Sequence, residues 1–225
     1  MKELLLYTIY LFPGQGADER LFSALTFNEG YKVVNIRYPE PRHGETMASF
    51  AEAIKPQINV NEKYIFIGVS LGGMIISELA AITNPEKVIL ISSAKCRGEL
   101  PRLYRLQGRL RINKAVPGSL TRYGAILLQG IVEPDSWTNR EIFQDMLKRK
   151  TPVYFKRTVD MIVNWNRKIP MENVVHIHGT GDHTLPIRLV KPDYTVKGGS
   201  HMMVLTKGAE ITKLVNEILM QGNSR

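Results

Sequence analysis

One short segment constrains the fold of this chain more than any other. Residues 64–69 are apolar and rich in β-branched and aromatic side chains, which predicts a buried strand. The strand runs into Gly68-Val69-Ser70-Leu71-Gly72, and residues 71–82 then have the apolar spacing of a helix. A strand that turns directly into a helix strains its central residue and leaves room only for glycine beside it. Ser70 is therefore predicted to be exposed at the edge of a sheet. A serine with a purely structural role in a glycine-containing turn would have the same sequence pattern.

Strand-like and helix-like segments alternate along most of the chain. We expect strands at about residues 4–12, 31–36, 63–69, 87–92, 173–178 and 192–197. Helices are expected at about residues 18–27, 46–58, 71–82 and 209–220. This alternation favours an α/β fold, in which a mostly parallel sheet of about six strands carries helices on both faces. With 225 residues the chain has the length of one domain with a full core, so we predict a single domain over residues 1–225.

The alternation is interrupted after the fourth expected strand by a basic segment. We predict that it forms an inserted helical cap at about residues 97–170. Between Arg97 and Lys168 it holds 15 Lys and Arg against 6 Asp and Glu, so it accounts for the whole net charge of +9. Such a surface can attract nucleic acid, an anionic lipid surface or an acidic protein, and it is also typical of a plain solvated helix face. Nucleic acid is not expected as a partner, because no interleaved aromatic motif or known binding module accompanies the charge.

Three helices are expected within this cap. Thr138-x-x-Glu141 has the pattern of a capping box, and Thr151-Pro152 is typical of the start of a second helix. Residues 100–112 are also helical in spacing, with a stripe of leucines and a stripe of arginines about 100° around the helix from it. The stripes are Leu103, Leu106 and Leu110, and Arg102, Arg105 and Arg109. We expect the leucines to roof an apolar pocket and the arginines to meet anions.

Two further segments supply the partners that a nucleophilic serine needs. A serine hydroxyl is a poor nucleophile at neutral pH and requires a base, which in turn requires a group that orients it. Asp182 lies in a glycine-rich turn after the fifth expected strand, and His201 follows the sixth. The order Ser, Asp, His along the chain is the order found in α/β-hydrolases.

The sequence accordingly resembles the α/β-hydrolases, in particular short esterase-like members with a helical cap. The resemblance extends over nearly the whole chain and rests on four segments, Pro13-Gly14-Gln15-Gly16, Gly68-Val69-Ser70-Leu71-Gly72-Gly73, His178-Gly179-Thr180-Gly181-Asp182 and Gly199-Ser200-His201. It implies a minimal α/β-hydrolase fold, because the chain starts almost directly on the strand that leads to the first segment. Pro13-Gly14 stands where His-Gly is common in the family. Because this turn is implied to act through a backbone N–H, the change leaves the implied mechanism intact but loses one supporting side chain.

The resemblance also implies roles for individual residues. Ser70 would be the nucleophile, His201 the base and Asp182 the acid that orients it. The backbone N–H groups of Gln15 and Leu71 would form the oxyanion hole. The implied reaction is hydrolysis of a carboxylic ester or thioester through an acyl-enzyme, without a cofactor. Two alternatives stay open: an esterase or thioesterase whose substrate is carried by an acidic acyl carrier protein, similar to the pimeloyl-carrier methyl esterases, and a non-catalytic ligand-binding relative.

Other residues compete for these roles. Ser92 and Ser93 also end a strand but lack flanking glycines, so they are weaker candidates for the nucleophile. Glu99, after the fourth expected strand, is the rival for the acid, since some members of the family place it there. His43 lies in a turn-like segment and is interpreted as a surface residue.

A metal site is not expected. His176, His178, Asp182 and His183 resemble a metallo-hydrolase motif, but the acid comes two residues too late for it. Gly-x-Gly-x-x-Gly and phosphate-loop motifs are missing, which argues against a nucleotide cofactor. The single cysteine, Cys96, cannot form an internal disulfide, so we predict a cytoplasmic protein. The apolar residues 4–12 are too few to cross a bilayer as a helix, and no transmembrane segment is expected.

Overall fold

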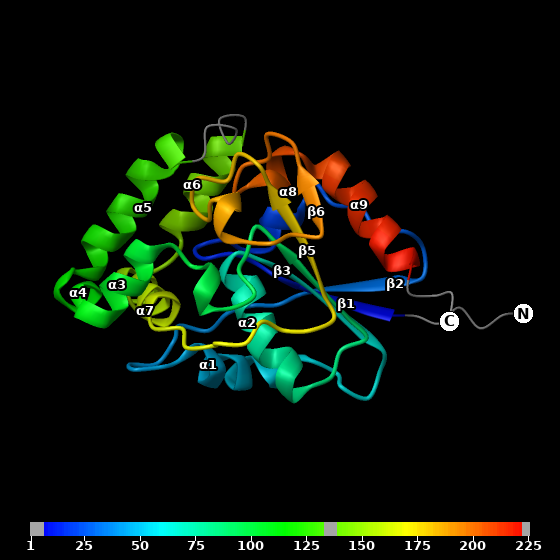
Figure 1. The fold of residues 1–225 in the computed structure, drawn as a ribbon, viewed down its shortest axis with the longest axis horizontal. Helices are drawn as coiled ribbons and strands as arrows, with labels where there is room; N and C mark the ends of the chain where they lie inside the picture. The colour runs from blue at the N-terminus through cyan, green and yellow to red at the C-terminus, as the bar shows by residue number, and fades with distance from the viewer. Residues whose placement is uncertain (1–6, 133–138, 222–225) are drawn as a thin grey trace, which may run out of the picture.

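The computed structural model describes residues 7–132 and 139–221, and its centre is a six-stranded sheet (Figure 1). The strands are β1 (Tyr7–Phe12), β2 (Tyr31–Asn35), β3 (Tyr64–Val69), β4 (Lys87–Ile91), β5 (Val174–Gly179) and β6 (Tyr194–Val196). They lie in the order β2-β1-β3-β4-β5-β6, and all their pairings are parallel. The prediction of a mostly parallel sheet of about six strands is confirmed, with small shifts at the strand ends; residues 4–6 lie outside the described residues.

The two faces of the sheet carry separate hydrophobic clusters. Successive side chains of a strand point to opposite faces. On β1, Ile9 and Leu11 belong to one buried cluster, whereas Tyr10 and Phe12 belong to the other. The first face is covered by η1 (Glu19–Phe22), α8 (Met203–Thr206) and α9 (Gly208–Met220), and the second by α1 (Met47–Ile54) and α2 (Leu71–Leu79). The sheet is thus buried between two layers, as the α/β class requires.

Only a short 3-10 helix forms where the sequence predicts a helix over residues 18–27. After η1 one more local bond forms, from the N–H of Leu25 to the carbonyl oxygen of Phe22 at 2.9 Å, and from Thr26 onward the backbone bonds to α9. The N–H groups of Thr26 and Asn28 donate to the side chains of Thr212 and Asn216, at 3.2 and 3.1 Å. Tertiary hydrogen bonds therefore replace the helical ones in this segment. The expected helices over 46–58 and 71–82 end in 3-10 turns at Lys55–Gln57 and Ala80–Ile82.

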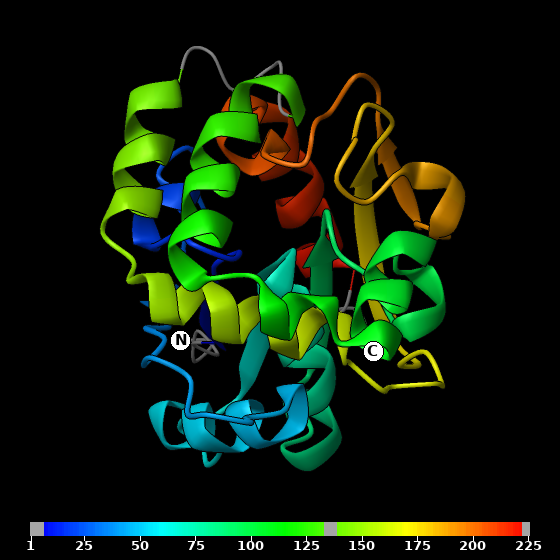
Figure 2. The same ribbon diagram turned by 90° about the vertical axis from the view of Figure 1, so that its left-hand side faces the viewer.

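Among the described residues, five α-helices lie between β4 and β5, after the 3-10 turn η4 (Arg97–Glu99). They are α3 (Arg102–Leu110), α4 (Ile112–Ala115), α5 (Gly118–Val132), α6 (Arg140–Lys148) and α7 (Pro152–Val163). They gather beyond the carboxyl ends of the strands, at the left of Figure 1, and Figure 2 shows them from that side with α7 crossing beneath α5. We call these helices the cap. The strand ends and the loops between them therefore lie beneath a helical layer.

The ends of two cap helices can be compared with the sequence. Thr151 caps α7 by accepting a hydrogen bond from the N–H of Tyr154 at 2.9 Å, which confirms the helix start predicted there. The helix α6 begins at Arg140 with Asn139 before it, one residue later than the predicted capping box. Thr138 itself lies outside the described residues.

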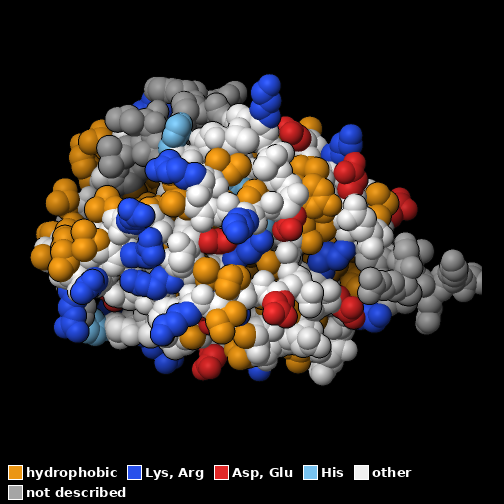
Figure 3. Space-filling model, viewed as in Figure 1, with side chains coloured by type: hydrophobic (Ala, Val, Ile, Leu, Met, Phe, Trp, Pro, Cys, Tyr) orange, Lys and Arg blue, Asp and Glu red, His pale blue; other side chains and the backbone are white. Residues whose placement is uncertain are grey.

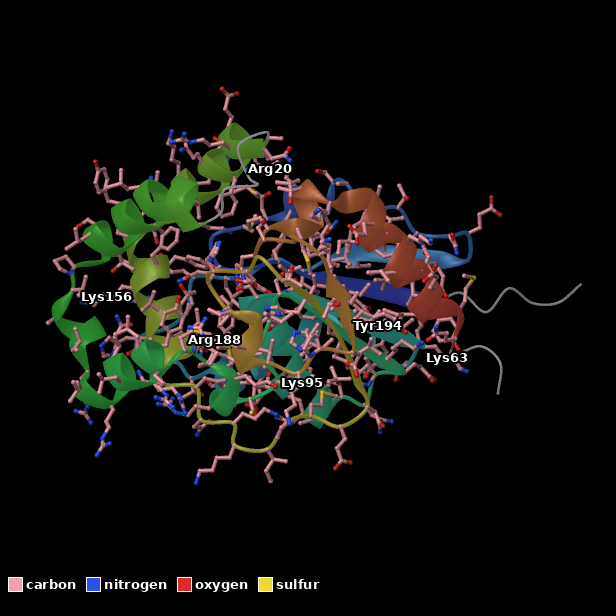
Figure 4. The ribbon with its side chains drawn as sticks, turned by 45° about the horizontal axis from the view of Figure 1, so that its top comes forward. Arg20, Lys63, Lys95, Lys156, Arg188 and Tyr194 are labelled. Atoms are coloured by element: carbon pink, nitrogen blue, oxygen red, sulfur yellow. The ribbon has the colours of Figure 1, made fainter. Side chains whose placement is uncertain are left out.

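Polar contacts fasten α6 and α7 to the rest of the molecule. Arg20, from η1, donates to Asp145 of α6 at 2.7 Å. Figure 4 labels Arg20 next to α6. Arg97 donates to the carbonyl oxygens of Val163 and Trp165 at the end of α7, at 2.9 and 2.6 Å. Each contact joins a cap helix to a segment outside the cap helices. These two helices, which are among those that border the site described below, are therefore held in place.

Candidate active site

Ser70 lies in the tight turn that the sequence predicts. β3 ends at Val69 and α2 begins at Leu71, and Ser70 between them has φ 53° and ψ −118°. A Cβ atom on Gly72 would lie 2.1 Å from the carbonyl oxygen of Phe12, so only glycine fits there. The backbone conformation of Ser70 is strained for a residue other than glycine. It costs on the order of 1–3 kcal/mol and persists because the surrounding structure stabilises it.

Ser93, one of the two rival serines, helps to hold this turn. Its Oγ donates to the carbonyl oxygen of Ser70 at 2.7 Å. Ser92 and Ser93 are both fully buried beneath the sheet edge, where no substrate can reach them. The bracing role of Ser93 has no signal in the sequence, because it depends on how close β3 and β4 bring their ends.

The structure brings Ser70, His201 and Asp182 together. The Nε2 atom of His201 lies 2.7 Å from Oγ of Ser70, and its Nδ1 atom lies 2.8 Å from Oδ2 of Asp182. The three come from the loops after β3, β5 and β6, at the same edge of the sheet. Glu99 instead accepts a hydrogen bond from the N–H of Lys95 at 2.6 Å. The sequence leaves Asp182 and Glu99 open as the acid, and the one that bonds to His201 is Asp182.

Asp182 is held in its ionised form. Burial raises the pKa of this carboxyl, but nearby His201 and hydrogen bonds from His178, His201 and the N–H of Leu185 outweigh burial and lower the pKa well below its usual range. The bond from Leu185 is 2.7 Å long and uses the other carboxylate oxygen, Oδ1. A fixed carboxylate of this kind can orient an imidazole and stabilise its positive charge.

Two buried histidines extend this network behind Asp182. The Nε2 atom of His178 lies 2.8 Å from the carbonyl oxygen of Leu185 and 3.3 Å from Oδ2 of Asp182. Both neighbours are acceptors, so in a neutral His178 the proton sits on Nε2 and Nδ1 is left as an acceptor. Nδ1 faces Nε2 of His176 at 3.1 Å. Burial, followed by the proximity of His178, lowers the pKa of His176 to about 3, so His176 is neutral and donates this bond.

The same histidines do not form a metal site with their neighbours. His183 is exposed, whereas His176, His178 and Asp182 are buried and bonded as described. Within residues 7–132 and 139–221, no group of three or more His, Cys, Asp or Glu side chains is placed to share a metal ion. His43 is exposed and lies away from this network, in the loop before α1.

The turn at residues 13–16 lies directly against Ser70. A Cβ atom on Gly14 would be 3.4 Å from Cβ of Ser70. The carbonyl oxygen of Pro13 accepts a hydrogen bond from the hydroxyl of Tyr38 at 3.0 Å, and Nε2 of Gln15 donates to Oγ1 of Thr158 on α7 at 2.7 Å. Gln15 therefore borders Ser70 on one side, with its side chain tied to the cap, and Leu71 follows Ser70 at the start of α2.

A cavity of about 480 Å³ opens beside Ser70 and His201. Most of its lining is apolar and comes from the cap and the neighbouring loops: Leu120, Ala125, Phe143, Leu147, Phe155, Ile162, Leu185 and Met202. No Asp, Glu, Lys or Arg is among the described residues that line it. The cavity is therefore suited to an uncharged, largely apolar group.

The face of α3 that borders the cavity differs from the expected one. Tyr104 and Gln107 line the cavity. The leucine stripe instead points outward, with Leu103, Leu106 and Leu110 exposed by 61%, 48% and 59%. The reason is Gly108, where a Cβ atom would lie 2.2 Å from the carbonyl oxygen of Val163. Because α3 packs against α7 through this glycine, the leucine stripe is turned away, and the expectation that it roofs the pocket is wrong.

Comparison with known proteins identifies the fold. No protein-family model matches the sequence, and no curated protein matches it by sequence. Among solved structures, MenH from S. aureus is similar with a TM-score of 0.72 at 12% identity, over 97% of this chain and 95% of that one. An esterase from Exiguobacterium antarcticum has a TM-score of 0.69 at 15% identity, over 95% and 92% of the two chains. The enol-lactonase from Burkholderia xenovorans has a TM-score of 0.68 at 16% identity, over 96% of this chain and 92% of that one.

These likenesses extend over nearly the whole chain and define its fold. The protein has the α/β-hydrolase fold, with a minimal, entirely parallel sheet among the described residues. Among those same residues, none of the helices combines the length and apolar content needed to cross a bilayer.

Proposed function

We propose that this protein is a serine hydrolase that cleaves a carboxylic ester or thioester through an acyl-enzyme. The observation that supports this most strongly is the unbroken chain of hydrogen bonds from Ser70 through His201 to Asp182, at the wall of an apolar cavity. A nucleophile, a base and a group that orients the base are the parts that covalent catalysis by serine requires. The α/β-hydrolase fold agrees with this reaction class.

In the proposed reaction, Oγ of Ser70 attacks the carbonyl carbon while Nε2 of His201 accepts its proton. Asp182 holds the other nitrogen of the imidazole and stabilises the positive charge that forms there. The backbone N–H groups of Gln15 and Leu71 donate to the oxyanion, and loss of one such donor typically costs about 2.7–4 kcal/mol.

His201 then passes its proton to the leaving alcohol or thiol as the C–O or C–S bond breaks. A water molecule, deprotonated by His201, attacks the acyl carbon. The acid is released and Ser70 recovers its proton. His201 acts once as a base and once as an acid in acylation, and again once as each in deacylation, so the proton balance closes without a metal or cofactor.

The cavity narrows the class of substrate. Its apolar lining and its lack of charged lining residues favour an uncharged acyl group. A charged acyl group would lose its hydration there without gaining a partner, which is costly. We therefore propose an ester or thioester of an aliphatic or aromatic acid as the small-molecule substrate. Delivery of this acyl group by an acidic carrier protein remains an alternative, because the basic cap borders the same cavity.

A fluorophosphonate probe tests the proposal directly. We expect it to label Ser70 and no other serine, because His201 activates only this hydroxyl. Ser70→Ala should abolish labelling, whereas Ser23→Ala, at an exposed serine, should label like the wild type. Turnover of p-nitrophenyl esters of graded acyl length would then define the preferred substrate. A non-catalytic ligand-binding protein would leave Ser70 unlabelled and these esters intact.

Two further expectations belong with this proposal. We propose that the cap helices form an insertion, at about residues 97–170, in a single domain over residues 1–225. A cytoplasmic location stays a prediction from the single cysteine, and cell fractionation tests it.

A further inference from the structure

The outer surface of the cap exposes more large apolar side chains than any other part of the described chain. On α3 they are Leu103, Leu106 and Leu110, and on α5 they are Leu120, Tyr123 and Leu127, with Ile112 on α4 between the two helices. Their exposed fractions lie between 45% for Ile112 and 63% for Tyr123. Both helices repeat these residues at intervals of three and four, so each carries an apolar stripe on its outer side. We call this surface the cap face.

Cations accompany the leucines of α3. Arg102, Arg105 and Arg109 each occupy the position just before a leucine of the stripe, and together with Arg97, Asn164 and Asn166 they border an open hollow of about 640 Å³. No carboxylate among the described residues pairs with these three arginines. In Figure 3, orange side chains gather at the left edge, over α3–α5, with blue side chains beside them.

Several arginines near these three have partners. In the cap, Arg149 and Arg157 pair with carboxylates, at 2.7 and 3.3 Å, and just before the cap Arg97 donates to backbone carbonyl groups. The positive charge on α3 is thus left unneutralised within the described chain. An exposed apolar stripe next to unpaired arginines is the pattern of a helix that lies in the interface of an anionic membrane.

We propose that the cap face docks this protein on the surface of an anionic lipid bilayer. The arginines of α3 would contact lipid phosphate and carboxylate groups, and the leucines of α3 and α5 would enter the boundary between head groups and acyl chains. The protein would lie on the membrane without crossing it.

Charge and shape favour a bilayer over other occupants. A second copy of the chain would bring two surfaces of excess positive charge together. Nucleic acid gains from aromatic stacking, but Tyr123 is the only aromatic side chain among the seven exposed ones. An acidic protein would need apolar side chains of its own shaped to fit separate projecting stripes, whereas fluid lipid adapts to them without a fixed shape.

The cap face is continuous with the candidate active site. Leu120, which belongs to the exposed stripe of α5, also lines the cavity beside Ser70. A docked cap would therefore place the rim of the cavity at the lipid surface. This consequence rests on the proposed function, and it predicts that the substrate's acyl chain is drawn from an amphiphile in the membrane.

Vesicle flotation with the full chain tests the docking. We expect binding to vesicles of phosphatidylcholine mixed with phosphatidylserine, and much weaker binding to phosphatidylcholine alone. Arg102→Gln with Arg109→Gln should weaken binding to the anionic vesicles about 25-fold, at about fivefold for each exposed arginine. The matched control is Lys32→Gln with Arg37→Gln, which removes the same charge from exposed positions outside the cap and should bind like the wild type.

A second pair of variants separates insertion from plain attraction of charge. Leu106→Gln with Leu110→Gln should weaken binding at least about tenfold, and the loss should persist in high salt, where charges are screened. Val60→Gln with Ile82→Gln, at exposed positions outside the cap, is the control. Circular dichroism of each variant checks that it folds.

Several results would overturn the proposal. It would be overturned if the wild type did not bind anionic vesicles, or if the control variants lost as much vesicle binding as the test variants. It would also be overturned if the leucine variant bound vesicles as well as the wild type. An acyl carrier protein that binds the wild type but not the arginine variant, while vesicles stay unbound, would replace the bilayer with an acidic protein. Ser70→Ala should still float with the vesicles while losing ester turnover, so failure of docking and failure of the proposed function are distinguishable.

Discussion

The two sides of the cavity are built in opposite ways. On the sheet side, the loops after β3, β5 and β6 are close-packed, with Gly72 and the buried oxygens of Asp182 fixed by immediate neighbours. On the cap side, α3 and α5 expose apolar residues to solvent. Both helices pack against α7. The sheet side holds reacting groups at fixed distances, whereas the cap side determines what surrounds and reaches them. Variants on the two sides should therefore fail in different ways.

The largest expected effect is on the triad. Asp182→Asn should lower kcat about 10⁴-fold, because the amide favours the wrong tautomer of His201. Ser70→Ala should lower it about 10⁶-fold, and combining the two should add little, since the three residues act as one unit. The measurement is turnover of a p-nitrophenyl ester. Glu99→Gln is the matched control and should change kcat only slightly; a loss as large as that of Asp182→Asn would move the acid to the loop after β4.

Stability should separate the two sides next. Gly72→Ala places a Cβ atom 2.1 Å from the backbone oxygen of Phe12, so the free energy of unfolding should fall by about 3 kcal/mol. Gly124→Ala on α5 meets nothing within 4 Å, and alanine favours a helix over glycine by about 1 kcal/mol, so this variant should be unchanged or slightly more stable. Urea unfolding of both variants measures these changes in the free energy of unfolding. Equal destabilisation would show that the cap is packed as tightly as the sheet edge.

The pH dependence of stability should reveal the buried histidine pair. The pKa of His176 falls from 6.5 to about 3 on folding, so between these values the unfolded chain binds the extra proton. The contribution of His176 to the free energy of unfolding should therefore be at its full value above pH 6.5. It should decrease as the pH drops toward 3, by on the order of a few kcal/mol. His176→Gln should flatten this slope, whereas His183→Gln, at an exposed histidine, should keep it. An unchanged slope in His176→Gln would assign the effect to other groups.

The smallest expected effect concerns the orientation of α3. Gln107→Trp should fill part of the cavity and lower kcat/KM for a long-chain p-nitrophenyl ester about tenfold, with little change for the acetate ester. Leu106→Trp, one residue earlier and 48% exposed, should change neither value. The reverse result would mean that the leucine stripe lines the cavity after all.

The sequence by itself determined the parts of this protein that depend on near neighbours along the chain. The buried strands follow from runs of apolar residues, and the turn at Ser70 follows from the glycines that flank it. The positions of Asp182 and His201 after the last two strands follow from the strand order, since parallel strands bring their carboxyl ends to one edge. These features need no knowledge of distant contacts, and the structure contains them where the sequence predicts them.

Other features were decided only by the tertiary structure. His201 bonds to Asp182 and not to Glu99 because of where the loops after β4 and β5 lie in space. The helix expected over residues 18–27 gave way to hydrogen bonds with α9, which lies almost 190 residues away along the chain. The orientation of α3 was set by Gly108, which weakens a helix when considered alone but permits the closest approach to α7. An amphipathic pattern shows that a helix has two faces, and only the packing of its neighbours determines which of them is buried.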